Sequence, residues 1–168
     1  MLELKNLTLD IAGLGIILYS PFAAVDIARG SNYLEEHYWD PSEVARHVRE
    51  GTIVGFGTGS PGSYHVRVCA GEPTLALMAR YPWRIRLALR VQDNTVCIRD
   101  LYDLTDWEPS CPVEQTLAVE SGTYRVTVAS RPPDSGVIGD HQEIVICLEP
   151  VVELPALTWE GVPLLGDE

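Results

Sequence analysis

A strict alternation of apolar and polar side chains between residues 83 and 91 constrains the fold of this chain more than any other feature. The intervening positions hold three arginines and one alanine. The apolar positions are Trp83, Ile85, Leu87, Leu89 and Val91. Successive side chains of a β-strand point to opposite faces of its sheet, so this spacing predicts a strand with one buried face.

Turn-forming residues follow this strand, and the same arrangement recurs later in the chain. Gln92-Asp93-Asn94 is typical of a tight turn, and residues 95–99 would return as the partner strand. Residues 116–120 would then run into a second turn at Ser121-Gly122, and residues 123–128 would run out of it. The sequence therefore predicts two antiparallel hairpins.

Weaker strand patterns occur in six further segments. They cover residues 2–11, 15–19, 52–56, 64–69, 75–79 and 143–148. Short strands at regular spacing, separated by Gly and Pro, favour two packed sheets. We expect a mostly β fold, an antiparallel β-sandwich of about eight strands with one short helix.

That helix is predicted over residues 42–50. Asp40 can accept hydrogen bonds from the free amides of the first turn, Pro41 suits the first helical position, and Gly51 suits the end. A narrow apolar stripe should pack the helix on a sheet edge; it consists of Val44, Ala45 and Val48.

The length of 168 residues is that of one domain, so we expect a single β-sandwich domain over residues 1–168. Residues 150–168 contain three prolines and should form an extended C-terminal strap. Trp159 and Leu164 are the predicted anchors of this strap.

The net charge of −12 is confined to one part of the chain. Residues 1–99 carry ten acidic and ten basic side chains, whereas residues 100–168 carry 14 acidic side chains against Arg125 and Arg131. An acidic protein repels phosphate backbones, so we expect no direct nucleic-acid binding. No run of 18 apolar residues exists, which predicts no membrane span.

The segment between the two predicted hairpins combines acidic side chains with large aromatic ones. Long ordered connections of this kind often carry function, and Tyr and Trp are typical interface anchors. We therefore predict a partner-binding site formed by Asp100, Tyr102, Asp103, Asp106, Trp107, Glu108 and Glu114. The alternative is that Trp107 packs over the end of the sandwich while the acidic groups face water.

Five arginines occur between residues 80 and 99. Arginine pairs with carboxylates in a forked geometry, so these side chains should be laced to neighbouring acidic residues. A face that reads phosphate is the alternative, and the acidic total disfavours it. The residues are Arg80, Arg84, Arg86, Arg90 and Arg99.

Motifs that carry enzyme chemistry are weak in this sequence. The glycine-rich run at residues 55–62 precedes a predicted strand rather than a helix, so it should be a connecting loop and not a phosphate cradle. Glu43, His47 and Glu50 could share a helix face, but no second histidine pair supports a metal. We predict no catalytic residue, no metal and no cofactor.

The cysteines and the N-terminus bear on the compartment. Cys69, Cys97, Cys111 and Cys147 form no C-x-x-C motif, and three of them fall in predicted strands, where free cysteines behave as buried apolar residues. The first 20 residues lack the basic leader of an export signal. We expect a cytoplasmic protein.

Two resemblances suggest a function. Residues 51–130, with the glycine-rich loop, the two hairpins and the Gly122-Thr123-Tyr124-Arg125-Val126-Thr127-Val128 strand, resemble the ComJ competence family, whose members inhibit a DNA-degrading nuclease. The C-terminal half is similar to an uncharacterised bacterial family met near polymorphic toxins. That similarity rests on Tyr102-Asp103-Leu104, Asp106-Trp107, Cys111-Pro112, Tyr124-Arg125-Val126-Thr127, Pro132-Pro133, Ser135-Gly136, Gly139-Asp140 and Trp159-Glu160-Gly161-Val162-Pro163.

The resemblances and the charge together imply an immunity protein, a non-enzyme that binds a cognate basic bacterial toxin. The first resemblance implies that this toxin is a nuclease, whose basic active site an acidic surface would cover. The alternative is a β-sandwich module that binds a small ligand or carbohydrate, with its site lined by Tyr38, Trp39 and Trp107. The oligomeric state is left open.

Overall fold

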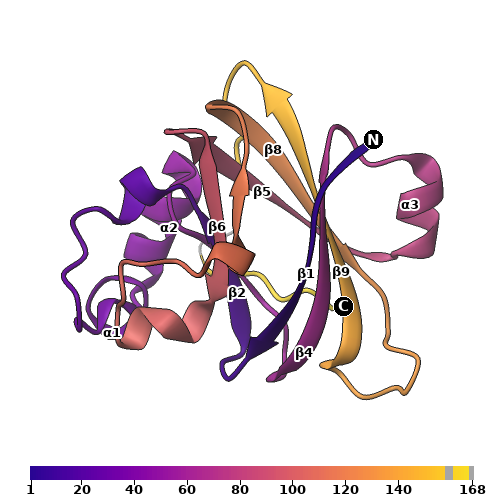
Figure 1. Cartoon of the computed structure of the whole chain (residues 1–168), viewed down its shortest axis with the longest axis horizontal. Helices are drawn as coiled ribbons and strands as arrows, with labels where there is room; N and C mark the ends of the chain where they lie inside the picture. The colour runs from indigo at the N-terminus through magenta and orange to yellow at the C-terminus, as the bar shows by residue number, and fades with distance from the viewer. Residues whose placement is uncertain (158–160, 167–168) are drawn as a thin grey trace.

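The computed structural model describes residues 1–157 and 161–166 and shows two packed β-sheets with helices on their outer faces (Figure 1). The five-stranded sheet has the order β1-β4-β9-β8-β5 and the four-stranded sheet the order β3-β2-β6-β7. The predicted mostly β sandwich is confirmed. The strands are β1 (Leu2–Ile11), β2 (Gly15–Tyr19), β3 (Val54–Gly57), β4 (Gly62–Ala70), β5 (Trp83–Val91), β6 (Thr95–Asp100), β7 (Thr116–Ala118), β8 (Gly122–Ser130) and β9 (Asp140–Val151).

Strand pairing departs from the prediction in two ways. β4 and β9 pair in parallel, whereas the other pairs are antiparallel. Both predicted hairpins are wrong, because β5 pairs with β8 and β6 pairs with β2 and β7. The two turns therefore lead from one sheet to the other.

The predicted turn at Asp93-Asn94 is present. Asp93 and Asn94 have φ angles of 57° and 52°, the left-handed conformation that Asp and Asn tolerate. The two turns also meet, since Ser121 donates its backbone N–H to Asn94 Oδ1 at 2.8 Å. An alternating pattern defines the two faces of a strand but not its partner, so the same pattern fits a hairpin and a crossing between sheets.

The helix predicted from Asp40 and Gly51 is present as α2 (Pro41–Glu50). Asp40 accepts a hydrogen bond from the Ser42 backbone N–H at 2.8 Å, and Gly51 ends the helix at a φ of 64°. The chain has more helices than the one predicted, namely α1 (Tyr33–His37), α3 (Leu75–Arg80) and the short 3-10 helices η1 (Pro21–Ala24), η2 (Leu101–Thr105) and η3 (Val113–Gln115). No helix among the described residues is long and apolar enough to cross a membrane.

The segment predicted as a strand over residues 75–79 is the helix α3. A short apolar run does not reveal its period, and the start signal is Thr74, whose hydroxyl accepts a hydrogen bond from the Leu77 N–H at 3.2 Å. Leu77 is buried while Leu75 is 83% exposed. The helix thus rests on the outer face of the five-stranded sheet by one side only.

The core has three parts. The largest lies between the sheets and takes inward-facing side chains from both of them. A second, rich in aromatic rings, lies between the four-stranded sheet and the layer formed by α1, α2 and residues 101–107. The third is a small cluster beneath α3. β6 is buried along almost its whole length because it is covered on both faces.

The end of the chain returns to the sandwich. Leu165 is 3% exposed, and its N–H donates to the Gly57 carbonyl at 2.8 Å. Leu164, a predicted anchor, is 60% exposed, so its neighbour Leu165 is the anchor instead. Trp159 lies outside the described residues.

Candidate functional site

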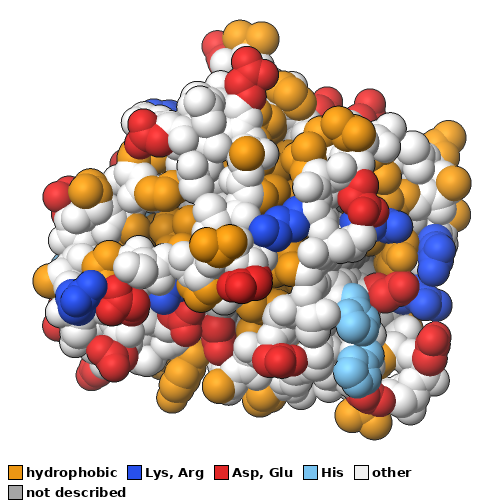
Figure 2. Space-filling model, viewed as in Figure 1, with side chains coloured by type: hydrophobic (Ala, Val, Ile, Leu, Met, Phe, Trp, Pro, Cys, Tyr) orange, Lys and Arg blue, Asp and Glu red, His pale blue; other side chains and the backbone are white. Residues whose placement is uncertain are grey.

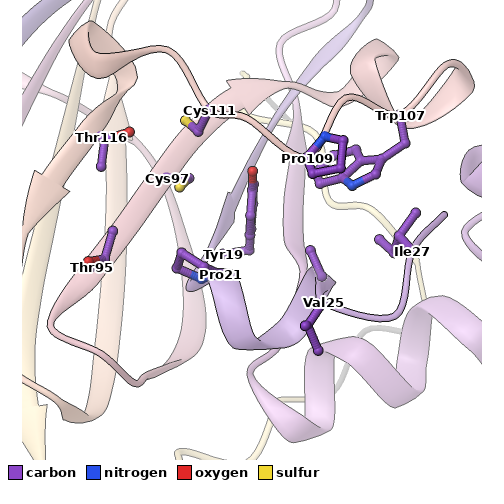
Figure 3. Close-up of a pocket in the computed structure, with 11 residues that line it drawn as sticks. Tyr19, Pro21, Val25, Ile27, Thr95, Cys97, Trp107, Pro109, Cys111 and Thr116 are labelled. Atoms are coloured by element: carbon purple, nitrogen blue, oxygen red, sulfur yellow. The ribbon is translucent and has the colours of Figure 1, made fainter. Parts of the chain in front are cut away.

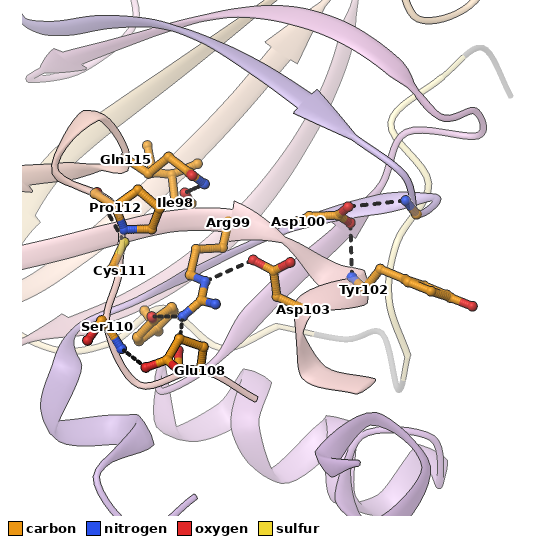
Figure 4. A network of polar contacts seen from close by, with 12 residues as sticks. Ile98, Arg99, Asp100, Tyr102, Asp103, Glu108, Ser110, Cys111, Pro112 and Gln115 are labelled. Carbon is orange, nitrogen blue, oxygen red and sulfur yellow. Dashed lines mark hydrogen bonds and ion pairs between the residues drawn. The ribbon is translucent and has the colours of Figure 1, made fainter. Parts of the chain in front are cut away.

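Arg99 organises the segment that follows β6 (Figure 4). Its Nε donates to Asp103 Oδ2 at 2.9 Å, and its Nη1 donates to the Glu108 carbonyl at 2.7 Å and to the Tyr19 hydroxyl at 3.2 Å. The guanidinium also lies 4.4 Å from the ring centre of Trp107. One buried cation therefore holds residues 103–108 in a closed loop against β2 and β6.

Asp100 has a structural role that the sequence did not reveal. Its carboxylate accepts the backbone N–H groups of Ala12 at 2.8 Å, Gly13 at 3.2 Å and Tyr102 at 2.9 Å. The side chain joins the β1–β2 turn to the first residues of η2 (Figure 4) and is buried. These contacts give Asp100 a role in the fold, and its role as a partner-contacting residue stays a prediction.

Trp107 is also buried, with 1% of its surface exposed. Its ring packs edge-on against Tyr19 at a centroid distance of 5.6 Å. This burial agrees with the alternative prediction for Trp107, in which its ring packs over the sandwich while the acidic groups face water. Trp107 therefore supports the loop from below, and a contact of its ring with a partner stays a prediction.

The remaining candidates lie at the surface. Tyr102 is 56% exposed, Asp106, Glu108 and Glu114 are exposed, and Asp103 is partly exposed beside Arg99. The structure brings Asp103 and Glu108 together around Arg99. Glu114 lies apart from them in η3, where the flanking backbone accepts hydrogen bonds from Lys5.

Helix α1 adds acidic groups that the sequence analysis did not assign to the site. It packs beside η2, and Glu35 and Glu36 are exposed on it. Figure 2 shows acidic side chains gathered over this part of the surface, at the lower left. These side chains form an acidic patch that consists of Glu35, Glu36, Asp103, Asp106 and Glu108. The run Glu35-Glu36 was visible in the sequence, but only the packing of α1 on η2 shows that it joins the site.

Neighbouring groups favour the charged form of Glu108. Glu108 accepts the Ser110 backbone N–H at 3.2 Å and an N–H of Arg29 at 3.0 Å. The Ser110 amide and the Arg29 guanidinium lower the pKa of the Glu108 carboxyl. Arg29 is 71% exposed at its side chain, so it neutralises one carboxylate of the patch without covering it.

A pocket of about 430 Å³ lies beneath residues 107–116 (Figure 3). Its walls are mostly apolar, and it contains Trp107 but neither of the other aromatics predicted for a ligand site. Tyr38 is buried and donates its hydroxyl to the Ile53 carbonyl at 3.0 Å, whereas Trp39 is 75% exposed. The three aromatics of the ligand-binding alternative therefore do not line one cavity.

The weak chemical motifs occupy structural positions. His47 Nε2 lies 2.7 Å from the Tyr33 hydroxyl, and its Nδ1 lies 2.6 Å from the Thr52 hydroxyl. Arg46 pairs with both Glu43 and Glu50. Over residues 1–157 and 161–166, no three His, Cys, Asp or Glu side chains gather in a way that could hold a metal ion. The glycine-rich loop joins β3 to β4, as predicted.

Comparison with known proteins places the fold. No family model matches the chain, and no curated protein matches it. The structure is similar to that of the product of crocagin biosynthetic gene J, with a TM-score of 0.57, 13% sequence identity, and coverage of 89% of this chain and 99% of the other. This similarity shows a shared fold over most of the chain.

ComJ is also among the similar solved structures. The crystal structure of ComJ from Bacillus subtilis, an inhibitor of the DNA degrading activity of NucA, matches with a TM-score of 0.48 and 12% identity. The match covers 89% of this chain and 97% of ComJ. The resemblance expected from the sequence is thus found among solved structures. The resemblance to the toxin-associated family stays a prediction.

Proposed function

We propose that this protein is a non-enzymatic inhibitor that binds a basic protein through its acidic patch. The observation that carries the proposal is the patch itself, five carboxylates on α1 and residues 103–108, with Arg29 as the exposed ion-pair partner of Glu108. Such a surface attracts a positively charged partner and speeds its association.

The patch is held ready for binding. Arg99 fixes the backbone of residues 103–108, and α1 packs against η2, so little conformational freedom remains to be lost when a partner docks. Preorganisation of this kind strengthens binding because it lowers the entropic cost of association. The exposed rings of Tyr102 and Trp39 supply apolar contact area within the same helical layer.

The class of partner follows from chemistry. A nuclease binds phosphates in a basic cleft, and carboxylates can occupy the places of those phosphates. The sequence resemblances to a nuclease-inhibitor family and to a toxin-associated family suggest a bacterial toxin that degrades DNA. We therefore propose an immunity protein that covers the basic active site of its cognate toxin, in the cytoplasm where such a toxin would act.

The test is capture of the partner from the native cell on the immobilised protein at low salt. We expect one stoichiometric basic protein that degrades DNA alone and is inactive in the complex. A variant with Glu35→Gln, Glu36→Gln and Asp106→Asn should bind that protein at least about tenfold more weakly, with a reduced association rate. Asp103 and Glu108 are left unchanged because Asp103 is paired with the buried Arg99 and Glu108 with Arg29.

The matched control removes the same number of exposed charges elsewhere, with Glu72→Gln, Glu120→Gln and Glu153→Gln. Its net charge equals that of the patch variant, so a general loss of attraction would weaken both equally. Equal affinities of the two variants would show that the acidic patch is not the interface. A captured partner with no nuclease activity would remove the nuclease assignment and leave the patch assignment standing.

A further inference from the structure

Two thiols from different elements meet in the pocket beneath residues 107–116 (Figure 3). Cys97 lies on β6 and is 2% exposed, whereas Cys111 lies on the segment that crosses over it and is partly exposed. Apolar side chains form much of the remaining wall, among them Pro21, Val25, Ile27 and Pro109. A thiol at the edge of an apolar pocket combines a reactive atom with space for a molecule beside it.

The surroundings of Cys111 favour its thiolate. The Cys97 thiol lowers the pKa of Cys111 most, followed by the Thr116 hydroxyl and the charge of Arg99, while burial and Asp103 oppose them. The pKa of Cys97 is raised, because its neighbour holds the negative charge and its own site is buried. Tyr19 also lines the pocket and stays neutral, since burial raises its pKa. The thiolate is the nucleophilic form of cysteine.

The chain holds a second pair of cysteines that serves as an internal reference. Cys69 and Cys147 are register partners on β4 and β9, and both are buried. Burial raises the pKa of both thiols, that of Cys147 to about 11. These two cysteines therefore combine neutral thiols with little access.

We propose that Cys111 is a nucleophilic site that adds to the electrophilic carbon of a small apolar molecule held in this pocket. An α,β-unsaturated carbonyl compound fits the chemistry, because a soft thiolate adds to its β-carbon. A sulfur lone pair forms the C–S bond, and the electron pair of the C=C bond moves to the α-carbon and its carbonyl. The α-carbon then takes one proton from water, which balances the proton that Cys111 released. No group leaves and nothing is oxidised or reduced.

The test uses N-phenylmaleimide as an apolar probe and iodoacetamide as a small polar one. With one equivalent of N-phenylmaleimide at pH 7, mass spectrometry of the intact protein and of its peptides should show a single adduct on Cys111. Cys111→Ser should abolish this adduct. Cys97→Ala should shift the pH dependence of the reaction to higher pH, which a change of access alone would not do.

The contribution of the pocket is tested with Val25→Trp, because Val25 lines the pocket and is exposed, so a larger ring can fill the space without disturbing the core. This variant should slow N-phenylmaleimide several-fold while leaving the iodoacetamide rate unchanged. Equal labelling of all four cysteines, or a Cys111 rate no higher than that of a free thiol, would overturn the proposal. If Val25→Trp slowed both probes equally, the proposal that the pocket binds an apolar molecule would be wrong.

Discussion

The outer faces of the two sheets differ in what covers them. The four-stranded sheet is covered by α1, α2 and residues 101–107, whose surface carries the acidic patch. Among the described residues, α3 covers one part of the outer face of the five-stranded sheet, and arginines occupy much of the rest. Those on β5 are Arg84, Arg86 and Arg90, and no ion pair within the described residues involves them.

The difference follows from what each face must do. A covered sheet buries backbone and side-chain polar groups, so it needs buried partners such as Arg99 and Asp100 to satisfy them. An open sheet with β5 at its edge needs charged side chains that discourage pairing with another strand. A strand of the covered sheet, such as β6, is therefore buried on both faces, whereas the edge strand β5 is buried on one face and carries arginines on the other.

The largest effect should come from the packing of the covered face. Trp107→Ala removes a fully buried ring that contacts Tyr19 and Arg99, and we expect it to lower the free energy of unfolding by about 4 kcal/mol. Leu77→Ala, on the buried side of α3, should cost about 2 kcal/mol because fewer buried side chains surround it. Urea denaturation measures both. Equal losses would contradict the view that the helical layer packs more tightly on the four-stranded sheet than α3 does on the five-stranded sheet.

Asp100→Ala should rank second. It leaves three backbone N–H groups without their acceptor, and we expect a loss of about 3 kcal/mol in the free energy of unfolding. The comparison on the other face is Glu149→Gln, which removes the charge from the half-buried pair with Arg125 but keeps an acceptor, and should cost less than about 1 kcal/mol. Denaturation of both variants at pH 7 checks the ranking, and Asp100→Ala falling within the range of Glu149→Gln would sink it.

The pH dependence of stability should also differ between the faces. Burial and the charge of Arg46 lower the pKa of His47 from 6.5 to about 4. The unfolded chain then binds a proton at higher pH than the folded one, so stability should fall by roughly 2 kcal/mol from pH 6.5 to pH 4. His47→Gln should flatten that part of the profile.

Glu143, on the open face, is the reference for this experiment. Its burial would raise its pKa, but hydrogen bonds from Arg131 and Tyr81 outweigh that effect and lower the pKa below its ordinary 4.5. Its contribution is present above that value and is lost as the pH falls through the folded pKa. Glu143→Gln should therefore leave the slope between pH 6.5 and pH 5 unchanged. If Glu143→Gln flattened the profile between pH 6.5 and pH 5 and His47→Gln did not, Glu143 rather than His47 would be the group responsible.

The smallest effects are expected for the exposed charges of both faces. Asp106→Asn and Arg84→Gln should each change the free energy of unfolding by less than about 0.5 kcal/mol, since both side chains are exposed and neither forms an ion pair within the described residues. Thermal melting of each variant is sufficient to check this. A large loss for Asp106→Asn would mean that the acidic patch is part of the fold.

Local patterns predicted the elements well. The strands at residues 2–11 and 15–19 have the expected bounds, and α2 has the expected cap and end. Pairing was not predictable, because alternation at residues 83–91 and 95–99 is compatible with either sheet as the partner. The sequence placed the candidate site in one segment, and that site stays a prediction. The burial of Asp100 and Trp107 was not predictable, because it depends on contacts with Gly13 and Tyr19, which are more than 80 positions away.

The turns that lead between the sheets affect how the chain must fold. β1 and β2, β3 and β4, β5 and β6, and β7 and β8 each follow one another closely and lie in different sheets. Within a sheet, β2 reaches β3 and β6 reaches β7 only after long excursions that build the helical layer. The most local pairing among the described strands is that of β8 with β9, across a loop at residues 131–139. The other pairings require longer loops to close. Loop closure must precede sheet formation, so refolding should take milliseconds to seconds, on the order of other all-β domains with distant pairings.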